Sequence, residues 1–480
     1  MNYKMMGRFH ALILAIEAGF MLPALILSLV QGPQKTAVAF AVSIAVVAVV
    51  AALLFLLSRG AKRDFYAREG LICVGSSWIV ISLFGCLPFF LSGEIPSFID
   101  ALFEMTSGFT TTGASVVANV EGLSKGILYW RSFSHWLGGM GVLVFLLALL
   151  PAEGFTMHLF RAESPGPEVG KLVPSLKKTA RVLYLTYIAL TVLNFIFLLA
   201  GGMPLFDSVC TALGTAGTGG FGIKNDSIAS YSPYLQNVTT VFMLLFGVNF
   251  SCYYLLLLRK VKPVLRDEEL RFYLLLIVGA VTLIAFNTNT MFDSVGDTIR
   301  HAAFQVAAII TTTGFATVDF NLWPTFSKCI LLILMVVGAC AGSTGGGMKC
   351  SRVLLLFKNL KRNISSILHP HKVQIVRVNQ KAVDERTVSG VGAYLAAYVI
   401  ILIASTLLLA IDGNSFETNF SASLSCLNNI GPGLDAAGPT SNYAFFSPLS
   451  KIVLILNMLA GRLEIFPILV LFNFHAWRKK

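Results

Sequence analysis

The feature that most constrains this chain is a series of long apolar runs along its whole length. Hydrophobic residues make up 56% of the 480 residues and only 12% are charged, which is about half the charged share of a soluble domain. A helix of about 20 apolar residues can cross the hydrocarbon core of a bilayer. We find ten such runs, at 10–31, 36–57, 70–92, 130–152, 180–201, 237–258, 270–290, 328–359, 388–411 and 448–473. The sequence therefore predicts an all-α membrane protein with about ten transmembrane helices.

The charges of the chain indicate how it is oriented. A net charge of +12 can indicate a nucleic-acid partner, but here Lys and Arg gather in alternate connections between the apolar runs. These basic segments are 1–8, 59–68, 161–181, 259–271, 349–386 and 478–480. Basic connections of membrane proteins face the cytoplasm. We therefore expect a multi-pass protein of the plasma (bacterial inner) membrane, in contact with lipid and not with nucleic acid, with both termini in the cytoplasm.

Four segments repeat one pattern, an amphipathic stretch of about 12 residues followed by a loop rich in Gly with Thr or Asn. They are 100–115 (DALFEMTSGFTTTGAS), 207–222 (DSVCTALGTAGTGGFG), 301–316 (HAAFQVAAIITTTGFA) and 418–433 (TNFSASLSCLNNIGPG). Each segment lies between two apolar runs on the outer side. The four segments align at Gly113, Gly220, Gly314 and Gly431, and each has a small residue six positions before that glycine. We expect four pseudo-symmetric helix–pore loop–helix units around one pore.

The repeat also divides the chain. The predicted parts are an N-terminal transmembrane hairpin at 1–60 and pore units at 61–160, 161–262, 263–362 and 363–480. The third unit has a broken second helix, and the segment 373–383, near the start of the last unit, predicts a small hairpin.

A loop of Gly and Thr at membrane depth must line a watery path, because its backbone polar groups cannot face lipid. Four such loops around an axis can turn carbonyl oxygens inward and replace the hydration shell of an ion. Each preceding helix points its negative C-terminal end at the loop, which favours a cation. The candidate ligands are the backbone carbonyls of Thr111, Thr112, Gly113, Thr218, Gly219, Gly220, Thr312, Thr313, Gly314, Asn429, Ile430 and Gly431.

The loops TTTGAS, GTGGFG, TTTGFATVDF and NNIGPG resemble the pore loops of the TrkH/KtrB/HKT superfamily of potassium transporters, although the second and fourth lack the TTTG form. The length and the extra hairpin are similar to the TrkH branch. The resemblance implies potassium uptake as a homodimer, with a cytosolic nucleotide-binding regulatory subunit resembling TrkA. Glycine at all four aligned positions implies potassium rather than sodium. No covalently bound cofactor is implied, only a potassium ion in the filter.

The eighth apolar run contains a second unusual feature, a cluster of five glycines. They are Gly338, Gly342, Gly345, Gly346 and Gly347. Glycine inside a helix costs about 1 kcal/mol per residue relative to Ala, so the run should break just below the third loop. The resemblance implies that this break is an intramembrane gate. A face of small residues that packs against neighbouring helices is the alternative.

Arg462 and Glu464 lie inside the last apolar run, where a charge is costly and usually faces a cavity or a partner. The depth of Arg462 below the fourth loop suits a barrier in the pore, and the resemblance implies the same role. A structural contact of Arg462 with Glu464 or with backbone carbonyls is the alternative.

Two transport functions remain open at this point. The first is potassium conduction, and the alternative is an ion-coupled secondary transporter, for potassium symport with protons or sodium or for an organic solute. Broken helices at the midplane are typical of such transporters, but here the broken elements are outer loops in parallel units. The seven histidines form no metal-binding spacing, and no intramembrane acid pair is present. We therefore do not expect an enzyme.

Overall fold

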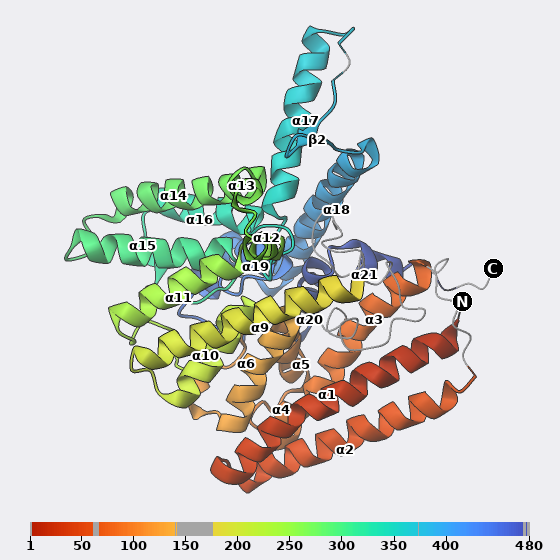
Figure 1. Ribbon diagram of the computed structural model, residues 1–480. Coiled ribbons are helices and arrows are strands. Elements are labelled where there is room, and N and C mark those ends of the chain that lie inside the picture. Colours follow the sequence, from red (N-terminus) through yellow and green to blue (C-terminus); the bar gives the residue numbers. More distant parts are fainter. Residues whose placement is uncertain are drawn as a thin grey trace.

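The computed structural model describes residues 2–60, 67–139, 141, 176–372, 374–473 and 477. Its elements are helices (Figure 1), apart from one antiparallel hairpin formed by β1 (Arg377–Val378) and β2 (Lys381–Ala382). This hairpin lies inside the segment for which the sequence predicts one. The predicted all-α class is confirmed.

The N-terminal hairpin consists of α1 (Tyr3–Gln31) and α2 (Gln34–Leu57). The two helices pack along their length, and α1 also packs on α3 and α6 of the first unit. The N- and C-terminal labels lie near each other in Figure 1, and the Tyr3 hydroxyl donates to the carbonyl of Trp477 at 2.7 Å. The described chain therefore begins and ends at the same end of the molecule.

Four units follow the hairpin, and each contains a long helix, a short helix, a loop and a second helix. The first unit has α3 (Ala67–Gly85), α4 (Leu87–Ser92), α5 (Phe98–Phe109) and α6 (Lys125–Gly139). The second has α9 (Leu176–Ala200), α10 (Leu205–Gly217), α11 (Pro233–Phe246), α12 (Phe250–Leu257) and α13 (Val261–Leu265). The third has α14 (Glu268–Thr288), α15 (Val295–Ile310), α16 (Thr325–Val337) and α17 (Cys350–Leu368). The fourth has α18 (Glu385–Leu409), α19 (Phe416–Asn428), α20 (Pro448–Arg462) and α21 (Phe466–Leu471). Short 3-10 turns lie at Val120–Gly122, Phe320–Leu322, Ala410–Asp412 and Asp435–Ala437.

The short helices α5, α10, α15 and α19 lie deep in the molecule and are the helices that lead into the four loops. Three of them begin at a serine whose hydroxyl accepts a hydrogen bond from the third residue after it, namely Ser97, Ser294 and Ser415. This is the usual N-terminal cap. The fourth, α10, begins after Pro204, whose missing N–H costs nothing at a helix start.

The ten predicted runs do not become ten continuous helices. Six helical segments of the described chain are long and apolar enough to cross a membrane alone, and a seventh is the α11–α12 pair, which bends by 89°. The expected break between α16 and α17 is present. The runs at 237–258 and 448–473 were predicted as continuous spans, and this is wrong because the first bends after α11 and the second is interrupted between α20 and α21. The run at 130–152 lies only partly within the described residues.

The structure gives a reason for each of the two unexpected breaks. Gly247 follows α11, and a Cβ there would overlap the Tyr273 hydroxyl, so the chain passes too close to α14 for a larger residue. Asn249 then caps α12 by accepting from the Ser251 amide at 2.9 Å. After α20, Glu464 and Ile465 both have positive φ, which a helix cannot include.

Candidate ion-conduction pathway

Each short helix ends in the same turn, in which the residue before the aligned glycine donates its N–H to a carbonyl five residues back. These bonds join Thr112 to Ser107, Gly219 to Gly214, Thr313 to Ala308 and Ile430 to Ser425, at 2.9, 3.0, 2.8 and 3.0 Å. This is the Schellman arrangement, which normally places glycine in the left-handed conformation at the helix end. The small residues noticed in the sequence supply the accepting carbonyls.

The four loops, which we call the filter loops (111–113, 218–220, 312–314 and 429–431), share an unusual backbone. Their first residues have positive φ although none is glycine: Thr111 at 55°, Thr218 at 52°, Thr312 at 58° and Asn429 at 57°. Their last residues, the filter glycines Gly113, Gly220, Gly314 and Gly431, have φ of 82°, 74°, 80° and 103°. Left-handed backbone at a non-glycine residue costs of order 1–3 kcal/mol and persists only where its surroundings enforce it. The same strain in four loops indicates one shared role.

The filter loops close into a ring. A Cβ added to Gly113 would clash with the carbonyl of Gly219 in the second loop. In the same way Gly220 faces the carbonyl of Thr313, and Gly314 faces that of Ile430. A Cβ on Gly431 would lie 2.7 Å from the carbonyl of Thr112, back in the first loop. Each filter glycine therefore lies against the carbonyl of the residue just before the filter glycine of the next loop. These contacts pass once through all four units and return to the first. The structure brings all twelve predicted filter residues together in this ring.

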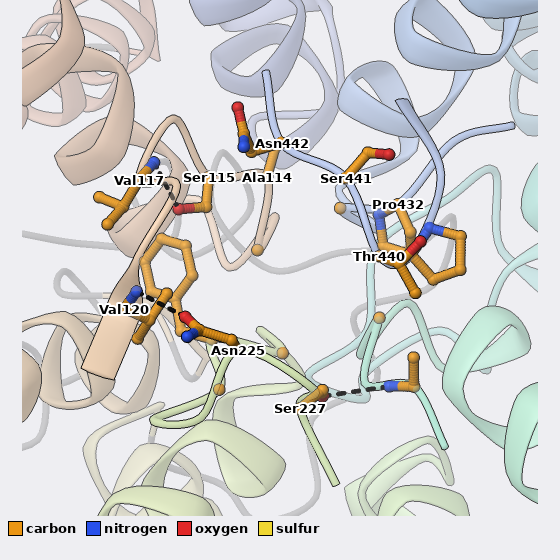
Figure 2. A pocket seen from close by; sticks show the side chains of 18 of the residues that line it. Ala114, Ser115, Val117, Val120, Asn225, Ser227, Pro432, Thr440, Ser441 and Asn442 are labelled. Carbon is orange, nitrogen blue, oxygen red and sulfur yellow. Dashed lines mark hydrogen bonds between the residues drawn. The ribbon is translucent and has the colours of Figure 1, made fainter. Parts of the chain in front are cut away.

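A cavity of about 120 Å³ opens on one side of this ring and is lined by loops from all four units. Figure 2 shows its polar side chains, with Asn225 accepting from the Val120 amide at 2.8 Å and Ser227 accepting from the Ala316 amide at 3.2 Å. The four filter glycines are among the lining residues. The ring is thus reached from this cavity, which forms a vestibule.

A buried ion pair supports the first two filter loops from behind. The Arg131 guanidinium lies 2.7 Å from a carboxylate oxygen of Glu104, and both side chains are almost fully buried. Glu104 also accepts from the Val116 amide at 3.0 Å, just after the first loop. Arg131 stacks over the Phe221 ring of the second unit at 4.1 Å and donates to the Gly222 carbonyl at 3.4 Å. The sequence gives no sign of this pair, because the two residues lie 27 positions apart in different helices.

The segment 338–349, which we call the gate loop, lies directly beneath the ring. The Gly346 amide donates to the Thr312 hydroxyl at 2.6 Å. A Cβ on Gly345 would lie 2.8 Å from the carbonyl of Thr311, and one on Gly346 would clash with the carbonyl of Asn428. The remaining predicted gate residues Gly338, Gly342 and Gly347 have φ of 70°, 68° and 78°. All five glycines thus lie where a Cβ is excluded by close contacts or by backbone conformation.

The gate loop fits into the bend between α11 and α12. The Cys340 amide donates to the Gly247 carbonyl at 3.1 Å, and the Phe250 amide donates to the Gly342 carbonyl at 3.0 Å. The Thr344 hydroxyl donates to the carbonyl that ends α11 at 3.2 Å. Backbone groups released by the two breaks therefore satisfy each other, as membrane depth requires.

Two cationic side chains contact the gate loop. Arg462 donates to the Thr344 carbonyl at 2.9 Å and to the carbonyls of Gly138 and Gly139 at the end of α6, the latter at 2.7 Å. Lys349 is buried and donates to the Gly345 carbonyl. Arg462 thus joins the fourth unit to the gate loop and to the first unit, next to the filter, as its depth in the sequence suggests. The predicted contact with carbonyls is present, while Glu464 pairs with Arg352. Lys349 was not predicted.

Comparison with known proteins identifies the family. The family model described as a cation transport protein, TrkH, matches residues 35–477. The chain belongs to the TrkH family. Relatives of this TrkH family member include the Trk system potassium uptake proteins TrkH of Salmonella typhimurium, 36% identical, and of Escherichia coli, 35% identical, each matched over 100% of both chains. The crystal structure of the potassium transporter TrkH from Vibrio parahaemolyticus superposes with a TM-score of 0.89 at 32% identity and full coverage of both chains.

Membership in a family of cation transporters settles two questions left by the sequence. The predicted superfamily is confirmed, and so is the expectation that this family member is not an enzyme. It also favours ion transport over the transport of an organic solute. No group of three His, Cys, Asp or Glu side chains that could hold a metal ion occurs within the described ranges.

Proposed function

We propose that this protein takes up potassium across the plasma membrane through one selectivity filter made by the four filter loops. The observation that carries the proposal is the closed ring in which each filter glycine lies against the carbonyl of the next loop. The relatives whose full length it matches are named potassium uptake proteins of the Trk system.

In this filter, backbone carbonyls of the twelve residues of the filter loops replace the water shell of a potassium ion. The left-handed turns hold the carbonyls in place, so little reorganisation is needed when the ion binds. The C-terminal ends of α5, α10, α15 and α19 lead into the loops, and their negative dipole ends favour a cation over an anion. The ion is the transported substrate and no covalently bound cofactor takes part.

The gate loop blocks the path at rest, with Arg462 as a barrier beside it. Its position against Thr311, Thr312 and Asn428 leaves the inner ends of the third and fourth filter loops covered. A unit charge 4 Å from an ion is worth about 4 kcal/mol at an effective permittivity of about 20. Even a small part of this energy from Arg462 slows the passage of potassium.

Two partners complete the proposal. A cytosolic nucleotide-binding subunit resembling TrkA would act on α17, which follows the gate loop directly and lies within the basic segment 349–386. A second copy of the chain would cover the apolar side chains exposed along the outer half of α17. These are Phe357, Leu360, Ile364, Ile367 and Leu368. The basic segments support a cytoplasmic position for both termini and for this helix.

Flux measurements in liposomes test the function. Purified protein is reconstituted, and potassium and sodium gradients are imposed separately, each with and without a proton gradient. We expect potassium flux well above sodium flux. Equal fluxes would contradict a potassium filter, and potassium flux that runs against its own gradient when protons or sodium flow inward would establish coupled symport.

A further inference from the structure

We propose that Glu269 is the positioning residue that clamps the gate loop shut, and that the acidic turn 267–269 relays cytoplasmic movement of α17 to it. This inference rests on the proposed gate function. It deepens that function, because it names the contact that has to break when the gate opens.

Glu269 binds the chain on both sides of the cluster Gly342–Gly347 with one oxygen atom. Its Oε1 accepts from the amide of Ala341 at 2.6 Å and from the amide of Ser351 at 3.0 Å. These amides lie ten positions apart and flank the cluster Gly342–Gly347. The carboxylate comes from a different helix, α14, and is 8% exposed. A single buried acceptor thus fixes the distance between the start and the end of the flexible stretch.

The position of Ser351 makes this contact strong. Ser351 lies in the first turn of α17, where backbone N–H groups have no partner within the helix. The residue before α17, Lys349, provides no side-chain cap and has a φ of 78°. The Glu269 carboxylate therefore caps α17 from outside, and a negative group at that end also meets the positive end of the helix dipole. Bonds from backbone amides to a charged acceptor are about twice as strong as neutral ones.

The two preceding acids of the same turn hold the cytoplasmic parts of the third unit. Glu268 pairs with Lys358 on α17, and Lys358 also donates to the carbonyl of Arg377 in β1 at 2.6 Å. Asp267 accepts from the side chain of Asn379, in the hairpin turn, at 2.9 Å. Figure 1 shows α17 projecting from the body of the molecule, with the hairpin label beside it.

These contacts make the turn 267–269 the point where α17 is fastened to α14. A pull on the projecting part of α17 acts first on the contacts of Glu268 and Asp267, and last on the hydrogen bonds of Glu269. Once Glu269 releases Ser351, its carboxylate no longer links the two sides of the cluster Gly342–Gly347. The stretch Gly342–Gly347 can then change its backbone at little cost, because most of its residues are glycine.

Potassium flux without any cytosolic partner tests the clamp. We expect Glu269→Ala to raise flux by at least about tenfold, because two charge-assisted bonds are lost. Glu269→Gln keeps an acceptor oxygen without the charge and should raise flux by less. Gly279→Ala, in the same helix, has no atom within 4 Å of the added Cβ and leaves both bonds of Glu269 in place, so it is the control with unchanged basal flux. A merely structural role for Glu269 predicts lower flux, not higher.

A second measurement tests the clamp without Glu269→Ala, in case that variant does not fold. A cysteine at position 343 in the gate loop, Ser343→Cys, should react faster with a water-soluble thiol reagent when Glu269→Gln is also present. Folded Glu269→Ala or Glu269→Gln protein with wild-type flux and unchanged reactivity would overturn the clamp. Deletion of residues 342–347 separates the two proposals: if the deletion does not raise flux, the gate itself fails, and if it does while the Glu269 variants do not, only the clamp fails.

Discussion

At the scale of single residues, the loops of the proposed filter have two kinds of left-handed position. The filter glycines have no alternative, because the space of a Cβ is occupied by the carbonyl of the next loop. The Thr and Asn residues two positions earlier accept strain instead and use their side chains. The Thr312 hydroxyl binds the gate loop, and the Asn429 amide donates to the carbonyl of Met458 at 2.8 Å and to the Thr112 hydroxyl at 3.1 Å. At Thr312 and Asn429 the strain is thus offset by contacts of these side chains.

Gly113→Ser should lower the ratio of potassium to sodium permeability. The new Cβ would overlap the carbonyl of Gly219, so that carbonyl has to move, and the hydroxyl adds a ligand. Relative permeability in liposomes measures the effect. Gly279→Ala is the control, because no atom lies within 4 Å of a Cβ at that helical position. A ratio that stays the same in Gly113→Ser would count against the filter role.

Arg462→Ala should increase potassium flux several-fold, since it removes a positive charge beside the path and the bond that holds Thr344. Arg462→Lys keeps the charge but cannot donate to the first unit and the gate loop at once, so its flux should be intermediate. Initial uptake rates at equal protein density provide the comparison. If both variants are well folded and as slow as the wild type, Arg462 has no barrier role.

At the scale of helices and loops, the sequence predicts the elements that recur in the four units. It does not predict features that depend on contacts between distant residues. The four short helices, their loops and the break after α16 follow from local patterns of Gly, Thr and small residues. The break at Gly247 depends on the Tyr273 side chain of α14, and the clamp at Glu269 depends on amides 72 and 82 positions away. No local pattern contains such information. The three acids at 267–269 lie within the segment 259–271, for which the sequence predicts only a cytoplasmic connection.

The pair of Glu104 and Arg131 predicts a stability effect at this scale. Glu104→Ala leaves the Arg131 charge buried without its carboxylate, which typically costs about 3–5 kcal/mol. The expected result is a clearly lower melting temperature in detergent and a reduced ratio of potassium to sodium flux. The double variant Glu104→Leu with Arg131→Met should recover part of the stability but not the ratio.

The exposed pair of Arg362 and Glu385 is the control for this test. The Glu385 side chain is 69% exposed, so Glu385→Ala should change stability by less than about 1 kcal/mol. A loss in Glu104→Ala that is no larger than the loss in Glu385→Ala would show that the buried pair does not support the filter loops.

At the scale of the whole molecule, the described chain leaves two kinds of apolar surface uncovered. The outer faces of α2, α9, α14 and α18 are exposed along candidate membrane spans, where lipid covers them. The outer half of α17 is different, because it projects beyond the other helices and its exposed apolar residues alternate with Lys358, Lys361 and Arg362. A mixed surface of this kind suits a protein partner better than lipid.

We predict that two copies of the chain meet through this surface of α17. Phe357, Leu360, Ile364 and Ile367 recur at helical spacing, so they form one stripe, and Ile364 at its centre is 53% exposed. Ile364→Glu places a charge in the stripe and should shift the purified protein from dimer to monomer, measured by light scattering after size exclusion. Ser366→Glu adds the same charge on the opposite side of the helix and should leave the dimer intact. A dimer that survives Ile364→Glu, or a wild-type monomer, would place the contact between copies elsewhere or exclude it.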